Sequence, residues 1–549
     1  MRSLLVAAGL TALLAACVSN PTASAAGDGP VVRASTGPVE GMRQGELSIF
    51  KGIPYAQAPV GRNRWRPPVP VAPWTEVRQT ADFGPACVQP TSRRTTIYSQ
   101  DLGRTSEDCL SLNVWSPDTG GKAPVIVWIH GGSLVAGSSK EPMYDGAALA
   151  AKGVVVVSIN YRLGVLGYLA HPGLSAESPT HASGNYGVMD QIAALEWVQR
   201  NVASFGGDPD NVTIAGESAG GLSILYLLTA PGAHGLFDKA IAQSSYFMSM
   251  SALRETVHGA PSAEQRGLGL ATALQALDVA ALRAMDPQTL TDGAALAGFF
   301  PAGIIDGVVL REEMLDIFNR GEQAPVPILA GFNSGEIRSL RVLAPPAPAS
   351  AAAYEQTIRD RYGDLADEYL RLYPAATMDE SILASTRDAF YGWTAERLAR
   401  AQASIGQPSF LYLFDHGYPA ADDAGLHAFH AAELPYLFAT LRTTPPNWPA
   451  IPDTPAETRI SEAMVDYWTS FARNGRPESD HGPAWPAFGA AGGPFMAFRD
   501  APVVERDLHP GAFAVQERAV CRKREAGNLG WYWNVGLISP VLPPSPACP

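Results

Sequence analysis

The sequence of 549 residues is poor in charge, and its charges include no dense basic stretch. Charged residues make up 17% of the chain, and the net charge at pH 7 is −13. A protein that holds a nucleic acid neutralises phosphates with clustered Lys and Arg. We therefore expect no nucleic acid among its partners.

Several other signals are missing. No group of His, Cys and Asp has the spacing of a metal site, and no glycine-rich phosphate loop occurs. We expect neither a metal ion nor a cofactor. The sequence also has no internal repeat and no long low-complexity tract, and its 46% hydrophobic residues are ample for a large core.

The longest apolar run near the N-terminus is too short to cross a bilayer comfortably. "MRSLLVAAGLTALLAAC" begins with the basic Arg2 and ends in small residues, as export signals do. "LAAC" resembles the lipobox of bacterial lipoproteins, in which Cys17 would be lipidated and become the new N-terminus. The alternative is an ordinary signal cleaved near Ala23–Ala25.

This interpretation divides the chain into a signal over 1–17, a flexible linker over 18–30 and a single catalytic domain over 31–549. We expect an exported protein of the bacterial cell envelope that meets the membrane only through its lipid. With ordinary cleavage it would be secreted.

Cysteines are few, and their number is odd. Once Cys17 is set aside as a lipid acceptor, four of the five remain, and four cysteines allow three pairings. We predict the sequence-local pairing, Cys87–Cys109 and Cys521–Cys548, which closes two short loops. An oxidising periplasm or cell surface would sustain both disulfides.

The pattern of apolar residues from residue 123 onward predicts an α/β fold. "APVIVWIHGG" and "GVVVVSINYR" are unbroken apolar runs, typical of parallel strands covered on both faces. "NYGVMDQIAALEWVQRNVASFGG" has apolar residues at helical spacing and ends at a Gly pair. The alternation predicts a doubly wound, mostly parallel sheet, with helical insertions near 250–320 and 340–410 covering the site.

One strand ends in an unusual way. "VTIAGESAGG" breaks at a glycine and places Ser218 between small residues. A tight strand-to-helix turn of this kind lifts a serine hydroxyl clear of the sheet, where it can attack. Gly-x-Ser-x-Gly is a loose pattern, however, and a glycine-rich chain can contain it by chance.

A serine nucleophile needs a base, an acid that orients the base, and donors for the oxyanion. In the α/β-hydrolase order the acid follows a later strand and the histidine comes last. Glu336 ends "VPILAGFNSGE", and "LHAFHAAELPYLF" contains both His427 and His430. Taken singly, Glu336 could be a solvated loop acid and His430 a structural hydrogen-bonding residue.

At this point the chain resembles the type-B carboxylesterases, the cholinesterase-like branch of the α/β-hydrolases, and in particular bacterial para-nitrobenzyl esterases. The resemblance covers about residues 31–500. The matching stretches are "FKGIPYAQAPVGRNRWRPP", "SEDCLSLNVWSP", "VIVWIHGG", "SGNYGVMDQIAALEWVQRNVASFGGDP", "TIAGESAGG", "GFNSGE", "HAAELPYLF" and "YWTSFARNGRP".

The resemblance implies a serine ester hydrolase that works through an acyl-enzyme. Ser218 is then the nucleophile, Glu336 the orienting acid, and His430 the base, because the family's histidine stands three residues before the Glu of "ELPY". Glu217 and the neighbouring glycines are interpreted as structural. His427 is interpreted as a loop residue.

Backbone N–H groups at the end of the first strand would form the oxyanion hole. "HGG" supplies Gly131 and Gly132, and Ala219 follows the nucleophile. By family position the donors are Gly132, Ser133 and Ala219. Ser133 stands where the family usually has a third glycine, so its side chain could crowd the acyl group.

The loop between Cys87 and Cys109 bears on the substrate, because that pair matches the family's first disulfide loop. Cholinesterases hold a quaternary ammonium there with a tryptophan. This loop has no tryptophan but carries Arg93, Arg94 and Arg104. We expect a neutral or anionic ester, although the arginines could simply be solvated.

Two other functions compete with ester hydrolysis. A non-catalytic adhesion or binding protein shares the fold in the neuroligin-like branch, but such proteins typically lose the nucleophile that this chain keeps. Hydrolysis of an amide, lactone or carbonate would use the same residues, because all pass through a similar tetrahedral oxyanion.

Overall fold

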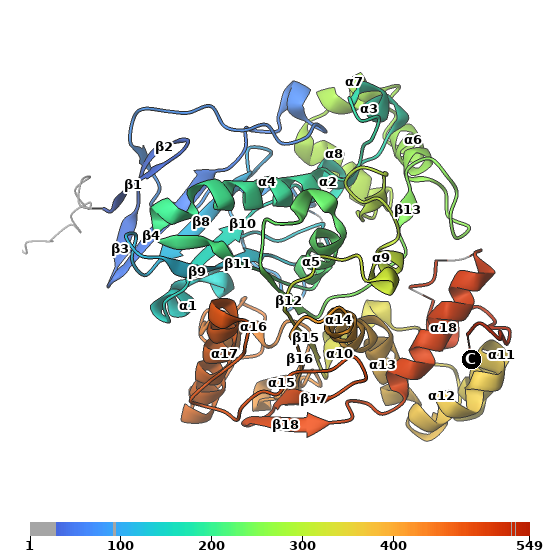
Figure 1. The fold of residues 1–549 in the computed structure, drawn as a ribbon. Helices are drawn as coiled ribbons and strands as arrows, with labels where there is room; N and C mark the ends of the chain where they lie inside the picture. Colours follow the sequence, from blue (N-terminus) through green and yellow to red (C-terminus); the bar gives the residue numbers. More distant parts are fainter. Residues whose placement is uncertain (1–28, 92–94, 529, 533, 549) are drawn as a thin grey trace, which may run out of the picture.

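An eleven-stranded mixed sheet organises the chain (Figure 1). The computed structural model describes residues 29–91, 95–528, 530–532 and 534–548. The predicted signal, the lipobox Cys17 and most of the predicted linker lie outside this range. The strand order is β18-β17-β16-β15-β12-β11-β9-β10-β8-β4-β3, and every pair from β17 to β10 is parallel.

The central strands are apolar along their whole length because both faces of the sheet are covered. In β9 (Ala123–Ile129), Val125 and Val127 belong to one buried cluster, and Ile126 and Trp128 belong to the other. Successive side chains of a strand point to opposite faces. The predicted doubly wound sheet is confirmed.

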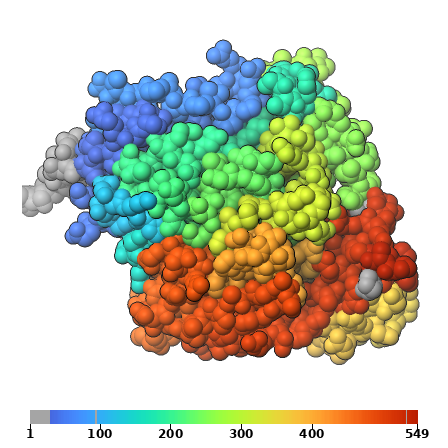
Figure 2. All heavy atoms as spheres, viewed as in Figure 1, coloured from blue at the N-terminus to red at the C-terminus, as the bar shows by residue number. Residues whose placement is uncertain are grey.

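Each face has its own helices. On one face lie α4 (Tyr186–Asn201) and α5 (Ala219–Thr229), which contribute Val188 and Leu222 to the first cluster. On the other face α17 (Pro455–Asn474) contributes residues such as Met464 to the second cluster. In Figure 2 the earlier part of the chain fills the upper region of this face of the molecule, and the orange and red C-terminal part fills the lower region.

The strands that hold the predicted motifs occupy the middle of the sheet, and further strands follow them. The middle strands are β10 (Val155–Ile159), β11 (Gly207–Glu217), β12 (Lys239–Gln243), β15 (Ile328–Asn333) and β16 (Ser409–Phe414). The flanking strands are β3 (Met42–Gln44), β4 (Leu47–Pro54), β8 (Ser111–Ser116), β17 (Pro494–Phe498) and β18 (Pro502–Arg506). β17 and β18, which no sequence pattern predicted, extend the sheet beyond β16.

The two segments predicted as insertions are mainly helical. The first contains α6 (Ala263–Ala273), α7 (Val279–Ala284), α8 (Pro287–Leu296) and α9 (Met314–Arg320). The second contains α11 (Ala351–Tyr362), α12 (Ala366–Leu372), α13 (Met378–Arg387), the π-helix η8 (Asp388–Gly392) and α14 (Trp393–Ser404). No helix in the described ranges is long and apolar enough to cross a membrane.

Candidate active site

Ser218 occupies the turn between β11 and α5, with a backbone conformation that L-residues rarely adopt. Its φ is 57° and its ψ −118°, and its N–H donates to the Gln243 carbonyl at 3.0 Å. A Cβ on Gly220 would collide with the carbonyl of Ile129. A glycine at position 220 is therefore what lets the start of α5 approach the end of β9.

Glu336 begins the short helix α10 (Glu336–Ser339), directly after β15 and its connecting loop. The side chain is fully buried, and Oε1 accepts the backbone N–H of Asn333 at 2.9 Å. Oε2 makes a short hydrogen bond with Nδ1 of His430. A backbone bridge between Gly335 and Phe429 joins the two loops, which explains how residues 94 positions apart come together.

The buried His430 imidazole lies between two carboxylates. Beyond the bond to Glu336, its Nε2 is 3.1 Å from Oε1 of Glu217, within ion-pair distance but without a formed hydrogen bond. No hydrogen bond joins His430 to Ser218 among the residues that the structure describes. Glu217, interpreted from the sequence as structural, is thus a contact of the histidine.

His427 lies in a different environment. It is half exposed, and its ring nitrogens lie 2.9 Å from Asp422 and 3.3 Å from Asp415. The hydrogen bond to Asp415 raises its pKa. Because both nitrogens face these loop carboxylates, His427 is a loop residue, as expected.

The two carboxylates around His430 affect the pKa of its imidazole. Burial alone would lower the pKa of His430, but Glu217 and Glu336 outweigh it and raise this pKa to about 9. Burial also raises the pKa of Glu217 to about 8. Each group therefore affects the pKa of the other, and the two titrate as a coupled pair.

A third buried carboxylate, Glu433, supports the site from behind. It accepts the side-chain amides of Gln243 at 2.9 Å and of Asn333 at 2.6 Å. Trp468 Nε1 in turn donates to Gln243 Oε1 at 3.0 Å. No sequence pattern predicted this network, although the Glu of "ELPY" is the residue that anchors it.

The loop after β9 lies against the serine turn. A Cβ on Gly131 would come within 2.9 Å of the Glu217 carbonyl and 3.2 Å of Ser218 Cβ, and a Cβ on Gly132 would collide with the Ala136 carbonyl. Ser133 has a positive φ of 58°. Within the described part of the chain, the backbone N–H groups of Gly132, Ser133 and Ala219 have no acceptor.

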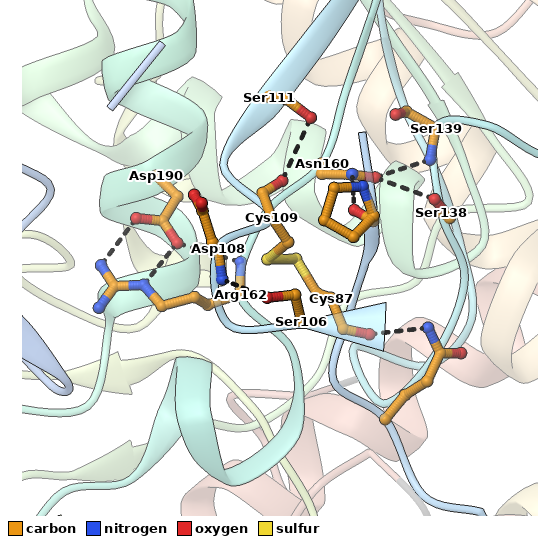
Figure 3. The surroundings of a disulfide bond; sticks show 12 residues. Cys87, Ser106, Asp108, Cys109, Ser111, Ser138, Ser139, Asn160, Arg162 and Asp190 are labelled. Atoms are coloured by element: carbon orange, nitrogen blue, oxygen red, sulfur yellow. Dashed lines mark hydrogen bonds and ion pairs between the residues drawn. A yellow bond between two sulfur atoms is a disulfide. The ribbon is translucent and has the colours of Figure 1, made fainter. Parts of the chain in front are cut away.

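The disulfide Cys87–Cys109 is connected to this loop (Figure 3). The Gln89 side chain bonds both the N–H and the carbonyl of Gly137, at 3.2 and 3.1 Å, and donates to the Cys87 carbonyl at 3.0 Å. Asn160, at the end of β10, accepts from Ser138 and from the backbone of Ser139, as Figure 3 shows. The disulfide therefore braces the backbone that follows Ser133.

The loop closed by this disulfide reaches the histidine through a tyrosine. The Tyr98 hydroxyl donates to the His430 carbonyl at 2.8 Å and lies 2.7 Å from Ser339 Oγ. No sequence motif singled out this tyrosine. Arg104 is exposed, whereas Arg93 and Arg94 lie outside the described residues.

The second predicted disulfide, Cys521–Cys548, is also present and joins α18 (Ala512–Ala526) to the C-terminal segment. Two disulfides indicate a protein that folds in an oxidising environment outside the cytosol. Among the described side chains, no group of three His, Cys, Asp or Glu residues is arranged to hold a metal ion.

Comparison with known families and proteins gives consistent matches over most of the chain. The profile of the "Carboxylesterase family" matches residues 28–515. Fumonisin B1 esterase of Sphingopyxis macrogoltabida is 38% identical over 85% of this chain and 86% of its own length. Para-nitrobenzyl esterase of Bacillus subtilis (strain 168) is 35% identical over 83% of this chain and 92% of its own length.

Solved structures show the same architecture. A PNB esterase structure superposes with a TM-score of 0.77 at 31% identity, over 88% of this chain and 99% of that one. Carboxylesterase EST55 of Geobacillus stearothermophilus superposes with a TM-score of 0.71 at 34% identity, over the same shares.

Proposed function

Because the chain belongs to the carboxylesterase family and is a carboxylic ester hydrolase, we propose that Ser218, His430 and Glu336 carry out the hydrolysis through an acyl-enzyme. The observation that supports this assignment is the position of His430. Its imidazole is held by Glu336 on one side and lies beside the residue that precedes Ser218 on the other.

In the first step Ser218 Oγ attacks the ester carbonyl carbon, and Nε2 of His430 takes the hydroxyl proton. Nε2 must exchange its contact with Glu217 for one with Ser218, and such bonds often tighten only when substrate is bound. Glu336 holds Nδ1 and so fixes the tautomer with a basic Nε2. His430 then protonates the leaving alcohol, and water releases the acid by the same path.

The oxyanion is assigned to the backbone N–H groups of Gly132, Ser133 and Ala219, which lack other acceptors in the described chain. Gly131 is a packing residue that lets this loop lie against the serine turn. Donors of this kind typically contribute 10²- to 10³-fold to kcat. A side chain at Ser133 does not remove its N–H.

Substitution of the nucleophile tests the assignment. Ser218→Ala should lower kcat for p-nitrophenyl butyrate by about 10⁴-fold or more without unfolding the protein. Ser223→Ala is a matched control on the same helix, because its hydroxyl donates to the Ala219 carbonyl and accepts from the Gln191 side chain. Substantial activity in a folded Ser218→Ala protein would disprove the triad.

The substrate proposed is a neutral or anionic ester. The loop between Cys87 and Cys109 has no tryptophan to hold a quaternary ammonium and carries Arg93, Arg94 and Arg104. A neutral short-chain ester should therefore have a higher kcat/KM than the matched choline ester. The reverse order would contradict this assignment.

The location proposed is the bacterial cell envelope. The export signal, the "LAAC" sequence and the four remaining cysteines in two disulfides support it. Lipidation of Cys17 would anchor the catalytic domain over 31–549 to a membrane surface.

A further inference from the structure

One tyrosine packs against the proposed catalytic histidine, and a second packs against the first. The ring of Tyr391 lies 5.3 Å from the His430 imidazole, measured between centroids, and meets the ring of Tyr246 edge-on at 6.1 Å. Tyr246 comes three residues after Gln243, whose carbonyl accepts the Ser218 N–H. Both tyrosines are buried, with 3% and 8% of their surface exposed.

The hydroxyls of these two tyrosines differ from those of their neighbours. Tyr98 donates to the His430 carbonyl at 2.8 Å, and Tyr161 donates to the His130 carbonyl at 2.8 Å. Tyr391 and Tyr246 make no hydrogen bond through their hydroxyls within the described residues. Neither hydroxyl is among the buried, unpartnered groups of the described core, where those of Tyr168 and Tyr412 lie. Both are therefore open to solvent, and a ligand atom that enters this space can accept from them.

The backbone holds Tyr391 in place through an unusual element. The π-helix η8 interrupts the helical run between α13 and α14, and such turns occur frequently at functional sites. At its start, Asp388 bonds Tyr373 at 2.9 Å and Arg387 at 2.7 Å. At its end, a Cβ on Gly392 would come within 2.8 Å of the Phe513 ring, so the turn packs closely there.

The surrounding charge limits what these hydroxyls can bind. Burial and then the nearby Glu336 carboxylate raise the pKa of Tyr391, and burial and then Glu217 raise that of Tyr246. Both phenols therefore stay protonated and can donate. An anionic ligand group would lie close to these same carboxylates, and like charges within a few ångströms repel strongly in a buried site.

From this geometry we infer that Tyr391 and Tyr246 bind an uncharged oxygen acceptor of the substrate, such as an ether, hydroxyl or carbonyl oxygen beside the scissile ester. The inference rests on the proposed function and narrows its substrate class to neutral, oxygen-bearing esters. The two tyrosines would then select the substrate and take no part in bond making.

Isosteric ester pairs test this selectivity. On the acyl side the pair is p-nitrophenyl methoxyacetate and p-nitrophenyl butyrate, and on the alcohol side it is 2-methoxyethyl acetate and butyl acetate. Each pair differs by one oxygen in place of a methylene. Dividing the kcat/KM of a variant by that of the wild type cancels the intrinsic reactivity of each ester.

Tyr391→Phe and Tyr246→Phe should each lower kcat/KM for the oxygen-bearing member of at least one pair by about 3- to 10-fold, the usual range for one hydrogen bond. The hydrocarbon member should stay within about twofold. Tyr373→Phe is the matched control, because it removes a phenol bonded to Asp388 at the start of η8. Any loss it causes should be equal for both members.

Equal losses for both members of both pairs, in folded and active Tyr391→Phe and Tyr246→Phe proteins, would overturn the inference. So would a preference for p-nitrophenyl hemisuccinate over its neutral methyl ester that the substitutions abolish, because the bound group would then be an anion. Either result leaves ester hydrolysis by Ser218 intact. If Tyr391→Phe does not fold, Tyr246→Phe still decides the question.

Discussion

Replacing Glu217 by Gln should shift the pH profile of the esterase toward acid. A neutral amide at this position removes the negative charge 3.1 Å from Nε2 of His430 and keeps the shape of the side chain. With an effective dielectric constant near 20, two unit charges at this distance interact by roughly 5 kcal/mol. One pKa unit corresponds to about 1.36 kcal/mol, so this sets an upper limit near four pH units.

The observed shift should be smaller, because Glu336 keeps its bond to His430 and a coupled pair titrates as a unit. Neighbouring charges usually move a pKa by about 1–3 units, and we expect a shift in this range. The sign follows from the proposed role. The neutral imidazole is the active form in this mechanism, so wild-type kcat/KM should rise with pH through the pKa of about 9. In Glu217→Gln the same rise should occur at lower pH.

The assay is kcat/KM for p-nitrophenyl butyrate between pH 5 and 10, corrected for spontaneous hydrolysis. Asp422→Asn is the matched control, since this carboxylate bonds His427 and has no contact with His430. Its profile should coincide with that of the wild type. A midpoint unchanged within about 0.3 pH units in folded Glu217→Gln would refute the idea that Glu217 raises the pKa of His430, for which a shift of at least about one unit is expected.

Three other predictions follow from the site and the chain termini. His430→Ala should be nearly inactive and His427→Ala close to wild type in kcat/KM, because only His430 contacts Glu336; the opposite result would place the base at position 427. Replacing both Cys87 and Cys109 by Ser should lower the free energy of unfolding by about 3 kcal/mol in denaturant titrations, since the disulfide closes a loop of 22 residues, and should also lower kcat by loosening the loop that Gln89 braces; full kcat would argue against that coupling. Cys17→Ser should move the protein from membrane to soluble fractions; a wild-type protein that is already soluble and begins after Ala25 would exclude the lipid anchor.

Local patterns carried much of the prediction of the fold. Unbroken apolar runs predicted the buried strands β9 and β10, and helical spacing followed by glycines predicted α4. These patterns involve residues within one strand or a few helical turns, so they can be recognised from the sequence alone. The short strands β17 and β18 were missed, because five residues with a proline at the start carry little periodicity.

Part of the candidate site was likewise predicted from local motifs. The order Ser218, Glu336, His430 was predicted from motifs, and the structure brings Glu336 and His430 into contact. The roles of the three residues stay predictions that Ser218→Ala and His430→Ala test.

What the sequence by itself determined is the set of strand ends from which these side chains emerge and the two disulfides that the structure contains. The choice of His430 over His427 came from the family resemblance and stays a prediction. Only the tertiary structure decided what surrounds the imidazole. Glu433 meets Gln243 across 190 positions, and Tyr391 reaches His430 from a π-helix in an insertion. Such contacts depend on strand order and on how the covering helices pack, and no spacing along the chain encodes them.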